Sequence, residues 1–274
     1  MTSEKSSRKV FLSLQVGLLA AVALVLAGIF ISSFIPPSIV LGKSFIVFAA
    51  QHRGATTGPQ TISIVIKNKP FGGHRDLHWK ARPQDDWLVV KPSTGRGAGE
   101  VEIRPRYGRL SPGTHETKLD VTAEGVRNSP QEVLVAVNII EQGASAPPFG
   151  WVDYPADGER VTGNFLDMWG WALDDIEVRE VRIKRSPFPG ETAKPVDPDG
   201  LIHVGIATFF KGMRPDVARV HADYPLNDRA GWQFRFPLRG FLSEGRESLI
   251  LHVFFVDKEG HIREMTPRTV RLAR

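Results

Sequence analysis

The longest apolar stretch of the chain runs from Val10 to Ile35 and contains no charged residue. As an α-helix, with a rise of about 1.5 Å per residue, this stretch would span roughly 39 Å, more than the ~30 Å of a bilayer core. Pro36 and Pro37 follow it directly, where a helix has to stop. The pattern therefore predicts a transmembrane helix over residues 10–36.

The flanks of this helix predict its orientation. Lys5, Arg8 and Lys9 precede it and only Glu4 offsets them, so residues 1–9 are expected to form a cytoplasmic tail. The alternative is a cleaved signal peptide, whose apolar core has about 7–15 residues and a cleavage site of small residues. The longer run here favours a single-pass anchor in the inner membrane, with the C-terminal domains periplasmic or extracellular.

After a short stalk over residues 37–44, apolar and polar residues alternate in short stretches that Gly and Pro separate. Short β-branched stretches spaced by roughly 10 residues, with turn residues between them, are typical of a β-sandwich. Residues 45–141 are therefore expected to form one such domain. Its strands are expected at residues 45–48, 60–67, 77–81, 87–91, 100–104, 116–122 and 131–139.

Residues 142–149 are mostly small residues and end with a proline pair before Phe149, which indicates a linker. The strand pattern then returns, and residues 150–274 predict a second sandwich. A proline-rich insert over residues 186–199 is longer than a turn requires and is a candidate contact surface. The expected fold class is mainly β, with a single N-terminal transmembrane helix followed by two tandem immunoglobulin-like β-sandwiches. Strands of the second are expected at 178–184, 202–209, 231–237, 248–256 and 268–272.

Four spaced segments of the first domain follow one another in a distinctive order: Leu77-His-Trp79, Trp87-Leu-Val-Val-Lys-Pro-Ser-Thr-Gly95, Leu110-Ser-Pro-Gly113 and Asn128-Ser-Pro-Gln131. Together they resemble the BACON family of bacterial β-sandwich domains. The resemblance implies an extracytoplasmic, immunoglobulin-like sandwich. Carbohydrate binding has been suspected for this family, but the suspicion attaches to no motif that can be carried over to these residues.

The second domain carries Gly170-Trp-Ala-Leu-Asp174 and, further on, Arg214-Pro-Asp-Val-Ala218. With Tyr224-Pro225 and Gly231-Trp-Gln-Phe234 in the expected order, it resembles an extracytoplasmic Ig-like domain of bacterial membrane and surface proteins. The resemblance implies a module of recognition or architecture without known catalytic residues.

Composition narrows the classes of partner. The net charge of +5 comes from 35 basic and 30 acidic residues and is spread thinly along the chain. Because no basic stripe interleaved with aromatic residues occurs, nucleic acid is not expected as a partner. The chain has no cysteine, which excludes disulfides, thiol chemistry and Cys-ligated metal.

Candidate chemical motifs are weak. Asp197-Pro-Asp-Gly200 resembles the start of a calcium loop but lacks the later ligands, which favours a β-turn. His74 and His78 would form a metal pair only on a helix, and here they enter a strand. Asp174 and Asp175 could act as paired acids, but Asp174 is expected instead to hold a turn, through Arg214 or backbone amides. We therefore expect no enzyme, no cofactor and no metal.

The 6 tryptophans are more informative. Trp79, Trp171 and Trp232 are expected to fill the sandwich cores, and Trp169 should face the same side as Trp171 because the two share parity on a strand. Trp87 and Trp151 are expected to be partly exposed, where they could stack on a sugar ring or anchor a protein interface. The candidate interaction surface contains these two tryptophans and comprises Trp87, Trp151, Phe188, Asp199, Arg214 and Asp216.

These features predict a non-catalytic, membrane-anchored accessory or scaffold subunit. Its anchor would lie in the lipid bilayer beside a larger integral-membrane complex, for example an energy-converting, transport or envelope-synthesis assembly. Tethering raises local concentration, so modest contacts of the sandwiches with that complex would suffice for stable attachment. The alternative is a cell-surface or periplasmic lectin-like module that binds glycan, which predicts an exposed aromatic pair on one sandwich face or loop end.

Overall fold

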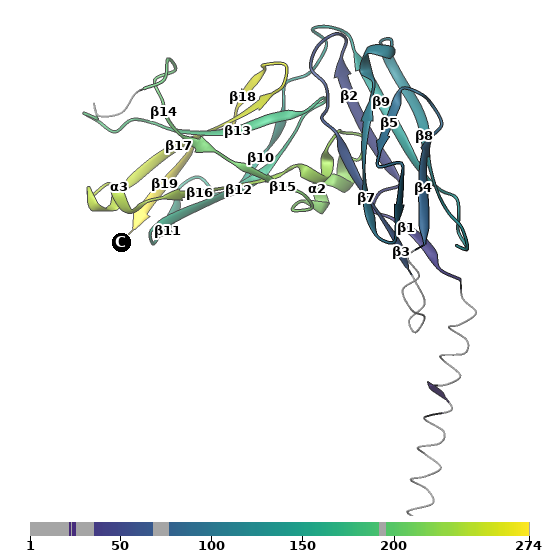
Figure 1. The fold of residues 1–274 in the computed structure, drawn as a ribbon. Helices are drawn as coiled ribbons and strands as arrows, with labels where there is room; N and C mark the ends of the chain where they lie inside the picture. Colours follow the sequence, from purple (N-terminus) through teal and green to yellow (C-terminus); the bar gives the residue numbers. More distant parts are fainter. Residues whose placement is uncertain (1–21, 23, 26–35, 68–76, 192–195, 274) are drawn as a thin grey trace, which may run out of the picture.

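The structure is a computed structural model that describes residues 36–67, 77–191 and 196–273, together with residues 22, 24 and 25 (Figure 1). Within these residues no helix has both the length and the apolar character needed to cross a bilayer. The transmembrane helix predicted over residues 10–36 lies almost wholly outside the described residues, as does His74. The described chain folds into two β-sandwiches that follow one another along the sequence.

The first sandwich consists of two sheets with the strand orders β1-β3-β7-β5 and β2-β9-β8-β4-β6. Strand β2 runs parallel to β9, whereas the other neighbours are antiparallel. The elements are β1 (Ser38–Leu41), β2 (Phe45–Gln51), β3 (Gln60–Lys67), β4 (His78–Pro83), β5 (Leu88–Lys91), β6 (Thr94–Arg96), β7 (Gly99–Pro105), the 3₁₀ helix η1 (Tyr107–Arg109), β8 (Gly113–Ala123) and β9 (Gln131–Ile140).

The core of the first sandwich follows from the alternation of its strands. On β3, Ile62, Ile64 and Ile66 point inward because side chains of a strand alternate between its two faces. Trp79 is 2% exposed and fills the core of the first sandwich, as the sequence of the chain predicts. A Cβ atom at Gly95 would lie 2.0 Å from the Trp79 ring, so only glycine fits opposite this indole.

The expectation that residues 37–44 form a stalk is wrong. Strand β1 pairs with β3 along its whole length, and Ile39 is buried in the first core. The side chain of Asn128 holds this edge strand: its Oδ1 accepts the Ile39 N–H at 2.8 Å, and its Nδ2 donates to the Ile39 carbonyl at 2.9 Å. Lys43 forms an ion pair with Asp228 of the second sandwich at 3.0 Å. The first sandwich therefore begins at Ser38, directly after the proline pair.

The second sandwich also has two sheets, with the orders β10-β12-β16-β15 and β11-β19-β17-β13-β14, and β18 pairs with β17. The elements are β10 (Phe149–Tyr154), β11 (Glu159–Thr162), β12 (Phe165–Leu173), β13 (Val178–Arg185), β14 (Ile202–Ile206), β15 (Thr208–Phe210), helix α2 (Pro215–Val220), the 3₁₀ helix η2 (Asn227–Arg229), β16 (Gly231–Pro237), helix α3 (Arg239–Ser243), β17 (Ser248–Asp257), β18 (Ile262–Glu264) and β19 (Arg268–Ala273).

The Gly170-Trp-Ala segment on β12 has a simple physical basis. Gly170 and Ala172 face the core, and Trp171 between them faces outward. Trp232 is 0% exposed in that core, and a Cβ atom at Gly170 would lie 2.7 Å from its ring. Trp232 therefore fills the core as predicted, whereas the prediction that Trp171 does so is wrong.

The sandwiches contact each other through the β2–β3 loop of the first and the β12–β13 turn of the second. Thr57 Oγ1 donates to the Ile176 carbonyl at 2.9 Å, and the Gly58 N–H donates to Glu177 Oε2 at 2.6 Å. Lys258, which follows β17, donates to Glu177 at 2.8 Å and to the Thr56 carbonyl at 3.1 Å. Polar contacts of this kind fix the β12–β13 turn against the first sandwich.

Candidate interaction surface

The outer side of the sheet β10-β12-β16-β15 carries most of the outward-facing aromatic side chains of the second sandwich. Strand alternation turns Trp169 and Trp171 to this side, so they share a face as predicted, but that face is not the core. Trp151 is 53% exposed on β10 and Phe210 is 45% exposed on β15, the two edge strands of this sheet. We call this surface the aromatic face, and it comprises Trp151, Tyr154, Phe165, Trp169, Trp171 and Phe210.

The register of the sheet brings these side chains into rows. Trp151 pairs with Trp171, Trp171 with Gly231, and Gly231 with Phe210, which makes one row across the four-stranded sheet. In the adjacent row Tyr154 stacks on Trp169, with ring centroids 4.4 Å apart and an interplanar angle of 15°. The Arg268 guanidinium lies 5.7 Å from the centroid of the Trp151 ring. Each exposed indole is therefore held in place on one side.

Trp171 is half-buried under the segment that contains α2. Its ring packs edge-on against Phe149 at 5.8 Å and lies 5.5 Å from the His221 ring. Tyr224 completes the cluster, 5.0 Å from Phe149, and Val217 of α2 is buried beside it. This packing stabilises the end of the aromatic face that lies nearest the first sandwich.

Ion pairs lie among the side chains of the aromatic face. Arg214 binds Asp216 with two hydrogen bonds, at 3.0 and 2.7 Å, and also contacts Asp153 of β10. Burial raises the pKa of Asp153, and the Arg214 charge opposes that rise. The backbone before Arg214 crosses the sheet so closely that a Cβ atom at Gly231 would lie 2.8 Å from Met213 Cβ. The Arg-Pro-Asp-Val-Ala segment thus places a fixed guanidinium across this face, between β16 and β10.

A second pair lies across β12 and β16. Arg235 donates to Asp167 at 2.7 and 3.0 Å, and this bidentate hydrogen bonding lowers the pKa of the Asp167 carboxyl. The same guanidinium lies 5.3 Å from the Phe165 ring. Between this pair and β15 the surface forms an open groove of about 610 Å³, whose lining includes Asp167, Trp169, Thr208, Phe210, Gln233 and Arg235.

The structure brings only part of the predicted interaction surface together. Trp151, Arg214 and Asp216 lie on or beside the aromatic face. Trp87 is half-buried on the first sandwich and packs against its core, so it belongs to a different region. None of these side chains is fully buried.

Phe188 and Asp199 have partners within their own domain. Phe188 packs against the second core, with the buried Arg185 guanidinium 4.9 Å from its ring. Asp199 accepts a hydrogen bond from Lys184 at 2.5 Å, and Asp197 pairs with the same ammonium at 2.7 Å. These contacts attach both ends of the proline-rich insert to β13, and they confirm a turn at Asp197-Pro-Asp-Gly200.

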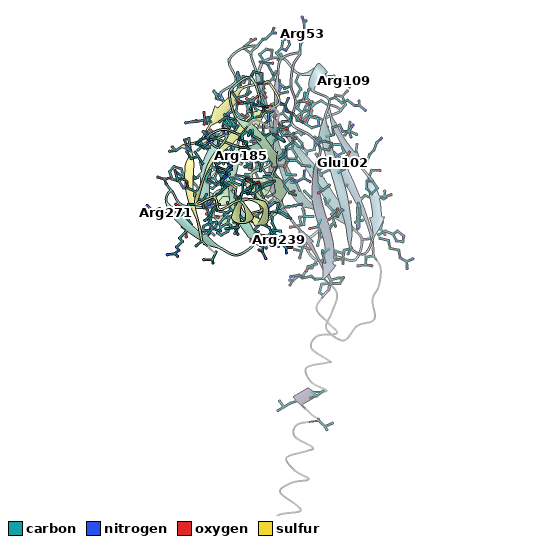
Figure 2. The ribbon with its side chains drawn as sticks, turned by 90° about the vertical axis from the view of Figure 1, so that its left-hand side faces the viewer. Arg53, Glu102, Arg109, Arg185, Arg239 and Arg271 are labelled. Atoms are coloured by element: carbon teal, nitrogen blue, oxygen red, sulfur yellow. The ribbon has the colours of Figure 1, made fainter. Side chains whose placement is uncertain are left out.

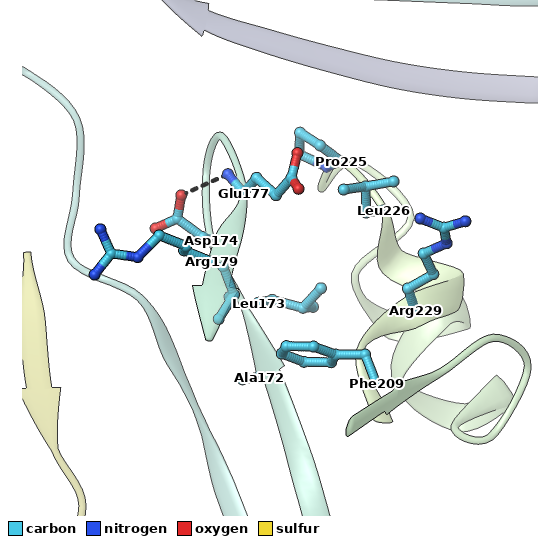
Figure 3. Close-up of a pocket in the computed structure, with 10 residues that line it drawn as sticks. Ala172, Leu173, Asp174, Glu177, Arg179, Phe209, Pro225, Leu226 and Arg229 are labelled. Atoms are coloured by element: carbon cyan, nitrogen blue, oxygen red, sulfur yellow. Dashed lines mark hydrogen bonds between the residues drawn. The ribbon is translucent and has the colours of Figure 1, made fainter. Parts of the chain in front are cut away.

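A smaller cavity of about 160 Å³ lies at the side of the second sandwich that faces the first (Figure 3). Leu173, Phe209 and Leu226 contribute its apolar wall, and Asp174 and Glu177 line its other side. Asp174 Oδ1 accepts the N–H groups of Ile176 and Glu177, each at 2.8 Å. Asp174 therefore holds a turn through backbone amides, one of the two arrangements expected from the sequence, and Arg214 pairs elsewhere.

Sequence reasoning missed several members of the aromatic face, among them Tyr154, Phe165, Phe210 and Arg235. The available signal was β12 itself, where bulky apolar residues occupy both parities over residues 165–173. A strand with one solvated face would alternate with polar residues, so such a pattern indicates that both faces contact other groups.

No family model matches the chain, and no curated protein matches it. Among solved structures, the periplasmic chaperone SfaE is 10% identical over 86% of this chain and 99% of its own, with a TM-score of 0.30. Fibronectin(III)-like modules of Clostridium thermocellum CbhA are 15% identical over 85% of this chain and 92% of theirs, with a TM-score of 0.26. A Bacteroides ovatus GH5 xyloglucanase is 16% identical over 46% of this chain, which spans only 27% of that enzyme, with a TM-score of 0.30. TM-scores this low assign neither family nor activity.

Proposed function

We propose that this chain is a non-catalytic accessory subunit, anchored in a membrane, that binds a protein of a larger integral-membrane complex through the aromatic face of its second sandwich. The observation that supports this proposal is the composition of that face. Trp, Tyr and Arg are the residues that most often dominate binding energy at protein interfaces. Here they lie on the outer side of one sheet, together with the ion pairs of Arg214 and Arg235.

The exposure of these side chains supports a binding role. A fully buried large apolar side chain is worth about 1.5–3 kcal/mol relative to an exposed one, so leaving Trp151 and Phe210 in water forgoes stability. Contiguous exposed apolar surface with a polar rim is typical of interaction sites. Arg214 and Arg235 are already paired with carboxylates, which preorganises their guanidinium groups and lowers the entropy lost on binding.

The packing of the indole rings favours a protein partner over a sugar. Sugar rings stack on an open aromatic surface, but Tyr154 covers one side of Trp169, and the Arg268 guanidinium lies near the Trp151 ring. A protein partner can instead use ring edges and the groove beside Trp169 together. With a membrane anchor, the effective concentration of the partner is high and a modest interface suffices.

Glycan binding is the second candidate, and the groove is the observation that favours it. Gln233, Asp167 and Arg235 offer donors and acceptors beside the Trp169 ring, a combination that suits sugar hydroxyl groups. A module of this kind would bind a glycan with the groove and need no protein partner.

The experiment compares extracts of native membranes. The chain is extracted in mild detergent, separated by size and detected, and we expect it to co-migrate with a larger membrane complex. The double variant Trp151→Ala/Phe210→Ala should migrate alone. The matched control, Val65→Ala/Leu134→Ala, removes two exposed apolar side chains from the first sandwich and should co-migrate as before.

Two results would contradict the proposal. Co-migration of the Trp151/Phe210 double variant would exclude the aromatic face as the interface. Migration of the unmodified chain alone, together with glycan binding that Gln233→Ala abolishes, would replace the scaffold function with the second candidate.

A further inference from the structure

Three carboxylates meet at the end of the second sandwich that faces the first. Asp174 follows β12, Asp257 ends β17, and Glu259 lies in the turn between β17 and β18. One carboxylate oxygen from each lies within 4.8 Å of the others. Asp174 is 2% exposed and Asp257 is 0% exposed, so water screens their charges poorly.

The hydrogen bonding of this cluster is incomplete at its centre. Both oxygens of Asp257 have partners: its Oδ1 accepts the N–H groups of Gly260 and His261 at 2.7 and 2.8 Å, and its Oδ2 lies 2.7 Å from His261 Nδ1. Among the described residues, however, Asp174 Oδ2 and both carboxylate oxygens of Glu259 are buried without a hydrogen-bond partner. Buried oxygens without partners cost free energy, and three acidic groups this close repel one another.

Basic side chains relieve this repulsion only in part, because His261 contacts Asp257 and Lys258 has other partners. Lys258, between Asp257 and Glu259 in sequence, turns away and binds Glu177 and the Thr56 carbonyl. A fourth acid, Asp175, adds to the negative charge, since its Oδ2 accepts the Ala146 N–H and its Oδ1 is also buried without a partner. The site thus has excess negative charge and free oxygens that face inward.

We propose that Asp174, Asp257 and Glu259 bind one calcium ion. The donors are all oxygen, which suits a hard divalent cation. Calcium–oxygen distances are about 2.3–2.6 Å, so two oxygens on one ion lie at most roughly 5 Å apart, and the 4.8 Å limit of the cluster is within that range. Magnesium, with oxygens at about 2.1 Å, would need them within roughly 4.2 Å of one another and in a near-ideal octahedral arrangement, which is a stricter requirement.

The place of the site gives the ion a structural role. Asp174 begins the turn whose next residues, Ile176 and Glu177, receive the hydrogen bonds from Thr57 and Gly58 of the first sandwich. An ion that joins this turn to the β17–β18 turn would fix the surface on which the first sandwich rests. Calcium would therefore stiffen the junction between the sandwiches, whatever the aromatic face binds.

The test uses the full chain in detergent, first treated with a chelator and then titrated with calcium. We expect one calcium ion bound per chain by calorimetry, and a rise of several degrees in the thermal unfolding temperature. Glu259→Gln should weaken calcium binding at least tenfold, because it removes a charged ligand. It should leave the fold intact, since the Glu259 carboxylate accepts no hydrogen bond from the described residues.

Two further variants complete the test of calcium binding. Glu116→Gln removes an exposed acid from β8 of the first sandwich and should leave calcium binding unchanged. Asp174→Asn retains the oxygen that caps the turn while it removes the charge, and should also weaken binding. Absence of calcium binding at millimolar concentration, equal binding of magnesium, or unchanged binding by Glu259→Gln would each overturn the proposal.

Discussion

In the first sandwich the Trp79 ring lies against Gly95, and in the second the Trp232 ring lies against Gly170. Both indoles are almost completely buried, and both fill the space between two sheets that have no disulfide to hold them together. A glycine opposite a large ring allows the two sheets to pack closely, because any Cβ atom there would overlap the indole. The cores of the two domains are therefore alike in principle.

The outward sides of the sheets differ. On β8 and β4 of the first sandwich the outward side chains are mainly charged or polar, including Glu116, Lys118 and Lys80. Figure 2 draws the side chains of both domains as sticks, with Glu102 on β7 labelled. On β12 of the second sandwich the corresponding positions hold Trp169 and Trp171. On these strands the first domain presents a polar surface to the solvent, whereas β12 of the second presents aromatic side chains suited to contact.

The largest effect should come from the buried tryptophans. Trp232→Ala removes an inward indole and should cost about 3–5 kcal/mol in the free energy of unfolding of the second sandwich. Trp79→Ala should cost a similar amount in the first. Thermal unfolding of the full chain, followed by circular dichroism, measures both. If either variant unfolds at the same temperature as the unmodified chain, the two cores do not depend on their buried tryptophans in the same way.

Trp171→Ala tests whether an outward indole differs from an inward one. Trp171 packs beneath the α2 segment with Phe149 and His221 but remains partly exposed, so we expect a loss of about 1–3 kcal/mol. Proteolysis near α2 should increase, because His221 directly after the helix loses its ring contact with the sheet. A loss as large as that of Trp232→Ala would show that the aromatic face is in fact part of the core.

The strands were predictable because alternation is visible locally. The pattern at residues 60–67 and 231–237 predicts β3 and β16 with the bounds that the structure has. Trp171 was misplaced because parity shows which residues share a face but not which face is inside. Strand β1 (Ser38–Leu41) does not show in the sequence, because a short strand beside a proline pair carries too few residues to show a period.

The candidate sites depend on contacts that sequence distance hides. Asp174 and Asp257 are separated by most of the second domain, and only the ends of β12 and β17 bring them together. The Trp169 and Tyr154 stack likewise depends on the register of β10 against β12. A single sequence offers the residue types but not these pairings.

The acidic cluster predicts a dependence on pH that the first sandwich should lack. Burial, with neighbouring carboxylates, raises the pKa of Asp174 to about 6 and of Glu259 to about 7. The folded state then binds more protons than the unfolded state, so this contribution to stability is present at low pH and is lost as the pH rises through about 6–7. The charged and titratable groups around the pair are Asp175, Asp257, His261, Glu177 and Lys258.

The measurement is thermal unfolding in a chelator at pH 5 and pH 8. We expect the second sandwich to lose roughly 1–2 kcal/mol between these values, discounted for partial exposure. Glu259→Gln should reduce that loss, because the amide does not ionise. A second sandwich that becomes more stable as the pH rises would contradict the assigned direction of the pKa shifts.

The smallest effect should come from Glu177→Gln at the junction between the sandwiches. Glu177 Oε2 accepts the Gly58 N–H and pairs with Lys258, so the amide keeps an acceptor but loses the charge. We expect a loss of about 1 kcal/mol, because hydrogen bonds and partly buried ion pairs contribute on this scale. Glu132→Gln is the matched control, since it breaks the exposed pair with Lys118 on the first sandwich and should leave thermal unfolding unchanged. If Glu177→Gln separates the unfolding transitions of the two domains and Glu132→Gln does not, the junction couples the unfolding of the two sandwiches. Identical unfolding profiles for both variants would show that each sandwich unfolds independently of the other.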